Sequence, residues 1–109
     1  MPNQDSSVDE ILSDLDMCER RVLRFLGKEK ITKNKNIRHE TIKNRLPDEN
    51  DGEIDNAIES LLNKGLMFQY RPKNYGLSSI GVTVAQSIVK EFLKERYGDL
   101  RILMVVLIP

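Results

Sequence analysis

A helix that ends at a glycine and runs directly into a strand–turn–strand is the feature that most restricts the fold of this chain. Apolar residues recur three or four positions apart over residues 53–64, which predicts a helix with one buried face. These residues are Ile54, Ala57, Ile58, Leu61 and Leu62. Gly65 follows, and glycine readily takes the positive φ at which helices end. Residues 66–71 then alternate between apolar and polar types, residues 72–74 predict a turn, and residues 75–77 supply a second short strand.

Further helices are expected on both sides of this unit. Residues 38–46 predict a short helix that Pro47 ends, and either Ser78 or Ser79 caps a last long helix that stops near Tyr97. The buried face of this last helix is expected to hold Val84, Ala85, Ile88, Val89 and Phe92.

The N-terminal segment carries apolar residues three or four positions apart between Val8 and Phe25, which is typical of a helix. Ser7 begins one capping-box pattern and Asp16 begins another. The segment therefore forms either one long helix or two short helices that meet near Asp16. Gly27 is the expected end of this helical region.

Two segments have no helical period. Residues 28–37 are polar and predict a loop or a short strand at Ile31–Thr32. Residues 100–109 hold eight apolar residues and one charged residue, Arg101, and have a high β-propensity. An exposed strand of this kind would aggregate, so we expect it to be buried. It either pairs within its own domain or crosses to a second copy of the chain, and the second arrangement is favoured.

Charge is segregated along the chain although the net charge is zero. Residues 20–46 carry ten basic and two acidic residues, whereas residues 1–19 and residues 47–63 each carry six acidic residues and no basic one. Such blocks create local electric fields without a net field. The basic block lies just before the helix over residues 53–64, where it predicts contacts with phosphate groups.

The string AIESLLNKGLMFQYRPKNYGLSSIG resembles the winged-helix transcription regulators of the MarR and PadR type. Their recognition helix ends in Leu-x-x-x-Gly-Leu, and Tyr-x-Leu-Thr-x-x-Gly opens their last helix. The matching residues are Leu61, Gly65 and Leu66 for the first motif, and Tyr75, Leu77, Ser78 (in place of Thr) and Gly81 for the second. The resemblance covers about residues 17–96. It implies a winged helix-turn-helix, a mainly α fold with a small β-hairpin wing (α+β), in one domain of residues 1–109. A helical extension at 7–16 and the apolar tail at 100–109 flank its core.

In this family the helix over residues 53–64 lies in the DNA major groove, the helix over residues 38–46 supports it, and the hairpin at 71–75 reaches phosphates or a neighbouring groove. The resemblance implies a cytoplasmic transcription regulator that binds double-stranded DNA as a homodimer. The expected DNA-binding residues are Lys33, Lys35, Arg38, His39, Lys43, Asn56, Ser60, Asn63, Lys64, Arg71 and Lys73.

Three acidic residues on the exposed face of the helix depart from the family pattern. Glu53, Asp55 and Glu59 stand where these regulators usually carry Ser, Thr, Arg or Gln. Carboxylates are repelled by phosphates, although a carboxylate can accept a hydrogen bond from cytosine. The alternative function is therefore a protein-docking module whose contact surface is the acidic face at residues 48–59.

Other classes of function find little support in the sequence. No combination of Ser, His, Asp and Cys suggests a catalytic set, so we do not expect an enzyme or a cofactor. His39 and Cys18 are the only residues of their types, which argues against a metal site, and Cys18 is expected to act as a small apolar residue. The polar N-terminus predicts no signal peptide, and no apolar run approaches the roughly 18 residues of a membrane span.

Overall fold

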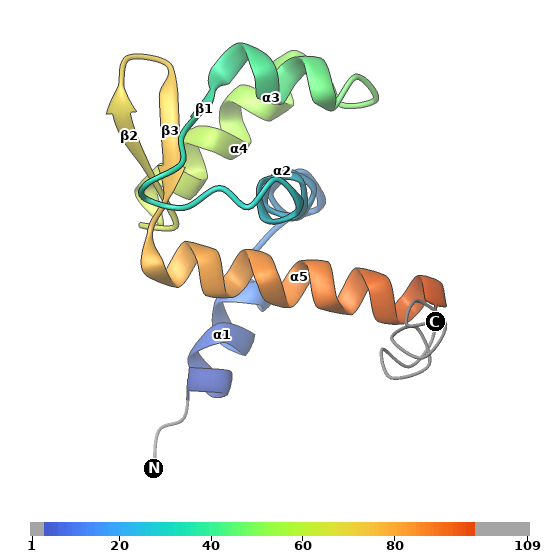
Figure 1. The fold of residues 1–109 in the computed structure, drawn as a ribbon. Coiled ribbons are helices and arrows are strands. Elements are labelled where there is room, and N and C mark those ends of the chain that lie inside the picture. The colour runs from blue at the N-terminus through green and yellow to red at the C-terminus, as the bar shows by residue number, and fades with distance from the viewer. Residues whose placement is uncertain (1–3, 98–109) are drawn as a thin grey trace, which may run out of the picture.

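The computed structural model describes residues 4–97, which contain five helices and a three-stranded antiparallel sheet (Figure 1). In chain order the elements are α1 (Gln4–Ser13), α2 (Met17–Lys28), β1 (Ile37–Arg38), α3 (His39–Arg45), α4 (Asp51–Asn63), β2 (Met67–Arg71), β3 (Asn74–Leu77) and α5 (Ser79–Tyr97). The mainly helical α+β class predicted from the sequence is confirmed. The apolar segment at 100–109 lies outside the described residues.

The N-terminal apolar residues are divided between α1 and α2, which is one of the two expected arrangements. Asp16 caps α2: its carboxylate accepts the amide of Glu19 at 2.8 Å, and the carboxylate of Glu19 accepts the amide of Asp16 at 3.0 Å. Ser7 does not open a helix, because α1 already begins at Gln4. Val8 of α1 is buried in the common core, so that the N-terminal extension packs against the rest of the domain.

The end of α2 differs from the expectation. Lys30 takes a positive φ of 57°, its amide donates to the carbonyl of Gly27 at 3.1 Å, and the amide of Ile31 donates to the carbonyl of Leu26 at 3.0 Å. These bonds form a Schellman motif with lysine at the left-handed position. Ile31 is buried, and no strand forms between Lys28 and Ile37, so of the two expected arrangements the loop is confirmed and the strand at Ile31–Thr32 is wrong.

Gly27 lies inside α2 and is not its end, because it has a packing role. A Cβ atom at this position would lie 2.9 Å from the side chain of Val89 and 3.1 Å from the carbonyl oxygen of Ala85, both in α5. The absence of a side chain therefore allows α2 and α5 to approach closely.

The sheet has the strand order β1–β3–β2, with β3 at its centre. Ile37 of β1 lies opposite Tyr75, and Met67 of β2 lies opposite Leu77. The predicted hairpin is confirmed, and the third strand is formed by residues 37–38 instead of residues 31–32.

The helix predicted over residues 53–64 is α4. Asn50 caps its start by accepting the amide of Gly52 at 2.8 Å. At its other end Gly65 has a φ of 75°, and the amide of Leu66 donates to the carbonyl of Leu61 at 3.0 Å. The predicted glycine end of this helix is confirmed.

Ser78 is the cap of α5, as one of the two expected residues. Its hydroxyl accepts the amide of Gly81 at 3.1 Å and donates to the carbonyl of Gly65 at 2.7 Å. A Cβ atom on Gly81 would lie 1.9 Å from the carbonyl oxygen of Leu66, so this close approach requires glycine. The buried face predicted for α5 holds for Val84, Ala85 and Ile88, whereas Val89 and Phe92 are only half-buried.

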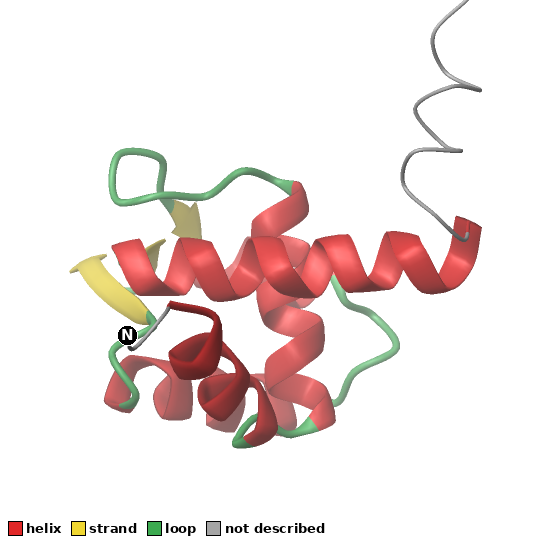
Figure 2. Ribbon diagram, turned by 90° about the horizontal axis from the view of Figure 1, so that it is seen from below, coloured by secondary structure: helices red, strands yellow, loops and turns green. Residues whose placement is uncertain are grey.

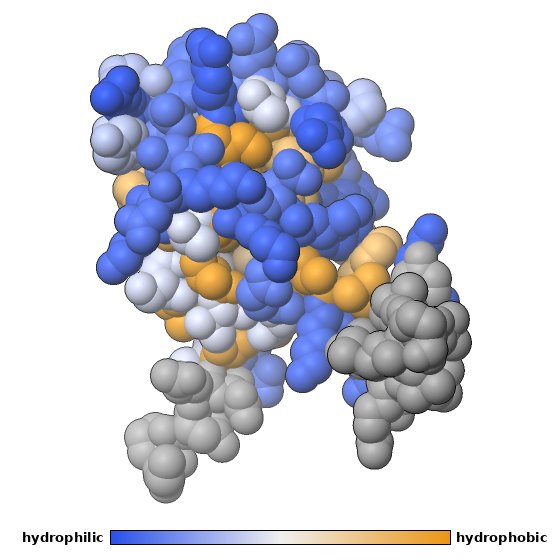
Figure 3. Space-filling view, viewed as in Figure 1, coloured by the Kyte–Doolittle hydropathy of each residue, from blue (hydrophilic) through white to orange (hydrophobic). Residues whose placement is uncertain are grey.

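Helix α5 crosses the other helices, and its C-terminal end projects beyond them (Figure 2). On the face seen in Figure 3, hydrophilic residues cover most of the upper part, around α3 and α4, and apolar side chains gather lower down, over α5. Within residues 4–97, no helix is both long enough and apolar enough to cross a bilayer.

Candidate nucleic-acid interface

A cleft of about 430 Å³ lies between the start of α3 and the turn that joins β2 to β3. Its lining residues are Arg38, His39, Glu40, Lys43, Arg71, Pro72, Lys73 and Asn74. Five of the eleven residues predicted to bind DNA are therefore brought together here. The cleft draws its basic groups from two segments that are far apart in the sequence.

Backbone contacts hold the two walls of the cleft together. Arg38 lies opposite Asn74 in the β1–β3 pair, and the amide of His39 donates to the carbonyl of Lys73 at 2.9 Å. Lys73 has a positive φ of 59°, which the tight turn requires at this position. The first turn of α3 is thus fixed directly against the tip of the hairpin.

Side chains extend this connection to α4. His39 Nε2 lies 2.6 Å from Asp55 Oδ1, and Lys43 Nζ lies 3.0 Å from the same oxygen. His39 Nδ1 lies 3.0 Å from the hydroxyl of Tyr75 in β3. His39 therefore contacts both α4 and the sheet.

The charges in this group influence one another. Hydrogen bonds from Lys43 and His39 hold the pKa of Asp55 below its usual value. Burial, together with the negative charge of Asp55, raises the pKa of the Tyr75 hydroxyl, which stays protonated. A carboxylate can only accept a hydrogen bond, so Nε2 of His39 donates to Asp55. In a neutral imidazole, Nδ1 then accepts from Tyr75.

The residues predicted to read bases from α4 do not all face solvent. Asn56 and Asn63 are exposed, as expected. Ser60 is half-buried and donates its hydroxyl to Glu19 Oε2 at 2.8 Å, so its assignment to the exposed face is wrong. Lys64 also donates to Glu19 Oε2 at 2.8 Å. Ser60 of α4 and Lys64, which directly follows α4, are thus directed towards α2 and away from the cleft.

Glu19 directs these two side chains because it is itself buried. Burial alone would raise the pKa of its carboxyl, but bonds from the amide of Asp16, from Lys64 and from Ser60 outweigh burial and lower the pKa. The carboxylate is therefore charged at neutral pH and is neutralised by Lys64. No pattern in the sequence marks this contact, since Glu19 and Lys64 are 45 residues apart.

Lys33 and Lys35 lie in the loop before β1 and do not line the cleft. Both are exposed, and Lys35 Nζ donates to the carbonyl of Glu29 at 2.8 Å, at the end of α2. Of the ten basic residues in the block, Arg38 and Lys43 line the cleft and Lys33 and Lys35 lie in this loop. Four others belong to α2: Arg20, Arg21, Arg24 and Lys28.

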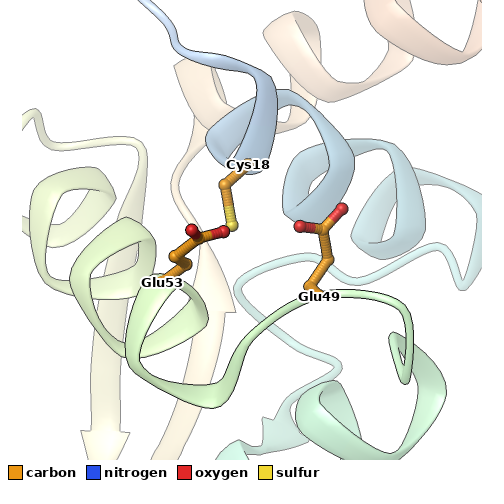
Figure 4. A group of neighbouring side chains, drawn as sticks. All are labelled: Cys18, Glu49 and Glu53. Atoms are coloured by element: carbon orange, nitrogen blue, oxygen red, sulfur yellow. The ribbon is translucent and has the colours of Figure 1, made fainter.

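A second polar group joins α2 to the start of α4. Cys18, Glu49 and Glu53 point towards one another (Figure 4), with their ligand atoms within 4.8 Å. Burial, followed by the charge of Glu49, raises the pKa of the Cys18 thiol to about 11, and Arg21 forms an ion pair with Glu49. A metal ion would have to displace both the thiol proton and the guanidinium group.

Comparison of the chain with protein-family models, with curated proteins and with solved structures finds no match.

Proposed function

We propose that the chain is a winged helix-turn-helix protein that binds double-stranded DNA. The order of elements from α2 to α5 supports the proposal, since a short strand, two helices joined by a tight turn and an antiparallel hairpin follow one another. In such a fold α3 and α4 form the helix-turn-helix, and the β2–β3 hairpin forms the wing.

The observation that carries the proposal is the convergence of basic side chains on the cleft between α3 and the hairpin. The charged basic residues are Arg38, Lys43, Arg71 and Lys73, and the lining also includes one acid, Glu40. The ring nitrogens of His39 are already bonded to Asp55 and Tyr75. Contacts of basic side chains with phosphates supply most non-specific affinity for DNA and fix the orientation of the protein on the duplex. The position of the cleft beside α4 would place this helix next to the bases.

The exposed surface of α4 offers groups that can read base edges. Asn56 and Asn63 are exposed, and asparagine can form two hydrogen bonds with adenine in the major groove. The charge of Asp55 is offset by its contacts with His39 and Lys43, which reduces the repulsion expected from the acidic residues of this helix.

Two features support a homodimeric transcription regulator, which we propose as the biological form in the cytoplasm. The C-terminal end of α5 projects beyond the other helices (Figure 2). A groove between α2 and α5 is lined by exposed Met17, by Ile88 and Phe92, and by three arginines of α2 and two glutamates of α5. Two-fold symmetry would match the two half-sites of a palindromic sequence.

The acidic face at residues 48–59 is the basis of the alternative function, protein docking. Glu49 of this segment pairs with Arg21, and Asp55 pairs with His39 and Lys43. Less negative charge is therefore left for a protein partner than the sequence suggests, and DNA binding is preferred.

Fluorescence anisotropy with a labelled random-sequence duplex tests DNA binding. We expect the dissociation constant to rise about a hundredfold or more between about 50 and 200 mM salt. Arg71→Glu with Lys73→Glu should weaken binding. It should also reduce the slope of the logarithm of the binding constant against the logarithm of the salt concentration, by about one for each lost phosphate contact. Lys90→Glu with Lys94→Glu, at exposed positions of α5, changes the net charge equally and should have a smaller effect. Absence of binding at low salt would refute the proposal.

The loop before β1 provides a further comparison. Lys33→Glu with Lys35→Glu should also weaken binding, since both lysines are exposed and belong to the basic block. The loss should be smaller than that of the hairpin pair, because these lysines lie outside the cleft.

A further inference from the structure

Asp55 and Glu59 lie one helical turn apart on α4, but their surroundings differ. Asp55 contacts His39 at 2.6 Å and Lys43 at 3.0 Å, and both partners line the basic cleft. Glu59 is exposed, and among the described residues it makes no hydrogen bond or ion pair with another side chain. One acid is therefore bonded to two residues that line the cleft, and the other only adds negative charge to the surface.

The contact between Asp55 and His39 also reaches the hairpin. Since Asp55 accepts a hydrogen bond from Nε2, it fixes the orientation of the imidazole ring, whose Nδ1 lies 3.0 Å from the hydroxyl of Tyr75. Tyr75 is buried in β3, the central strand of the sheet. The same histidine donates its backbone amide to Lys73 at the tip of the hairpin. Asp55 thus contacts two residues of the α3 wall, His39 and Lys43, and the ring of His39 links it to Tyr75 in β3 of the hairpin.

We propose that Asp55 is a positioning residue of the DNA-binding cleft, which strengthens DNA binding although its charge has the same sign as that of the phosphates. It holds Lys43 and His39 in the orientation in which they face the cleft, and it ties the hairpin to α3 and α4. This inference rests on the proposed function. It differs from the expectation based on charge alone, in which any acid on α4 weakens binding.

Two variants that each remove one negative charge separate these views. Asp55→Asn should weaken binding to a labelled random-sequence duplex about three- to tenfold and flatten its salt dependence, because Lys43 and His39 lose their orientation. Glu59→Gln should tighten binding about twofold, since only repulsion is removed. Asp55→Glu retains the charge and should recover part of the affinity.

Hydrogen exchange without DNA provides a readout that does not depend on the proposed function. In Asp55→Asn the amides of His39 and Tyr75 should exchange faster, whereas those in α2 should not change. Glu59→Gln should leave all of these rates unaltered. If exchange becomes faster in Asp55→Asn but neither the native protein nor any variant binds DNA, the proposed function is refuted. The contact from Asp55 through His39 to Tyr75 would still be supported.

Tighter binding by Asp55→Asn, to the same extent as by Glu59→Gln, would overturn the inference, because Asp55 would then act only by repulsion. Unchanged exchange at His39 and Tyr75 in Asp55→Asn would also overturn it. If Asp55→Asn lowers the overall stability, amide exchange becomes faster in α2 as well. The DNA affinity of Asp55→Glu then provides the test. This variant should then bind DNA more weakly than the native protein and more tightly than Asp55→Asn, and equal binding by the two variants would contradict the proposal.

Discussion

Glu19 performs two tasks that the sequence would assign to separate residues. It completes the capping box of α2 with Asp16, and it accepts hydrogen bonds from Ser60 of α4 and from Lys64, which directly follows α4. The side chain of Glu19 is 4% exposed and that of Lys64 is 27% exposed, so the carboxylate is buried and the ammonium group still meets water. Loss of Lys64 would leave the buried carboxylate without its counter-charge, and loss of the carboxylate would leave Ser60 and the amide of Asp16 without their acceptor.

Replacement of Glu19 by Gln should lower the free energy of unfolding by about 2 kcal/mol at pH 7. The size of this loss depends on pH, and it should decrease in acid. Because the folded protein lowers the pKa of Glu19 below 4.5, the charged carboxylate stabilises the fold above that pH, and this contribution is lost as the pH falls through the folded-state pKa. Urea unfolding at pH 7 and below pH 4.5 should therefore show a smaller difference between the two proteins in acid. Glu59→Gln, at an exposed position, serves as the control, and an equal difference at both pH values would contradict this account.

Residues whose role is decided by their neighbours in the chain could be predicted. Gly65 ends α4 and Ser78 caps α5, and both roles depend on backbone groups a few positions away. The roles of Asp55 and Ser60 could not be predicted, because their partners lie 16 and 41 positions away. The amphipathic pattern of α4 places Ser60 on the exposed face, but its hydroxyl donates to the buried carboxylate of Glu19 on α2.

At the level of elements, Gly27 allows α2 and α5 to pack closely against each other. Gly27→Ala should lower the free energy of unfolding by about 1–2 kcal/mol, because the added methyl group meets Val89 and the backbone of Ala85. This loss should occur although alanine favours helices by about 1 kcal/mol over glycine.

Gly52→Ala is the matched control for this substitution. Gly52 lies in the first turn of α4, where the only close atom is the terminal oxygen of Asn50 at 3.1 Å. We expect a change within about 0.5 kcal/mol there, measured by urea unfolding. A stabilised Gly27→Ala protein would show that α2 and α5 can separate without cost.

Most elements could be predicted, and the position of the third strand could not. Long helices and the hairpin have regular patterns of apolar residues, whereas β1 has only two residues and no pattern of its own. Ile31 and Ile37 look alike in the sequence, but Ile31 closes the Schellman motif of α2 and Ile37 enters the sheet. Ile37 belongs to a strand because it lies opposite Tyr75 of β3, and this partner lies far along the chain.

For the whole molecule, the proposed dimer can be tested at the groove between α2 and α5. Met17 is 63% exposed at the edge of this groove and begins α2, where an acidic residue is tolerated by the helix dipole. Met17→Glu should raise the dimer dissociation constant about tenfold or more, measured by sedimentation equilibrium. Ile80→Glu, at an exposed apolar position near the other end of α5, should leave it unchanged. A monomeric native protein, or equal effects of both variants, would contradict the proposed interface.

The central position of β3 has a consequence for the order in which the chain folds. The β2–β3 hairpin joins neighbouring segments and can form within microseconds, whereas β1 must reach β3 across the whole of α3, α4 and β2. A strand of two residues has little stability by itself. We therefore expect β1 and α3 to dock late in folding and to detach first in local unfolding. The basic cleft, which has one wall in each part, would then be the last region of the molecule to be assembled.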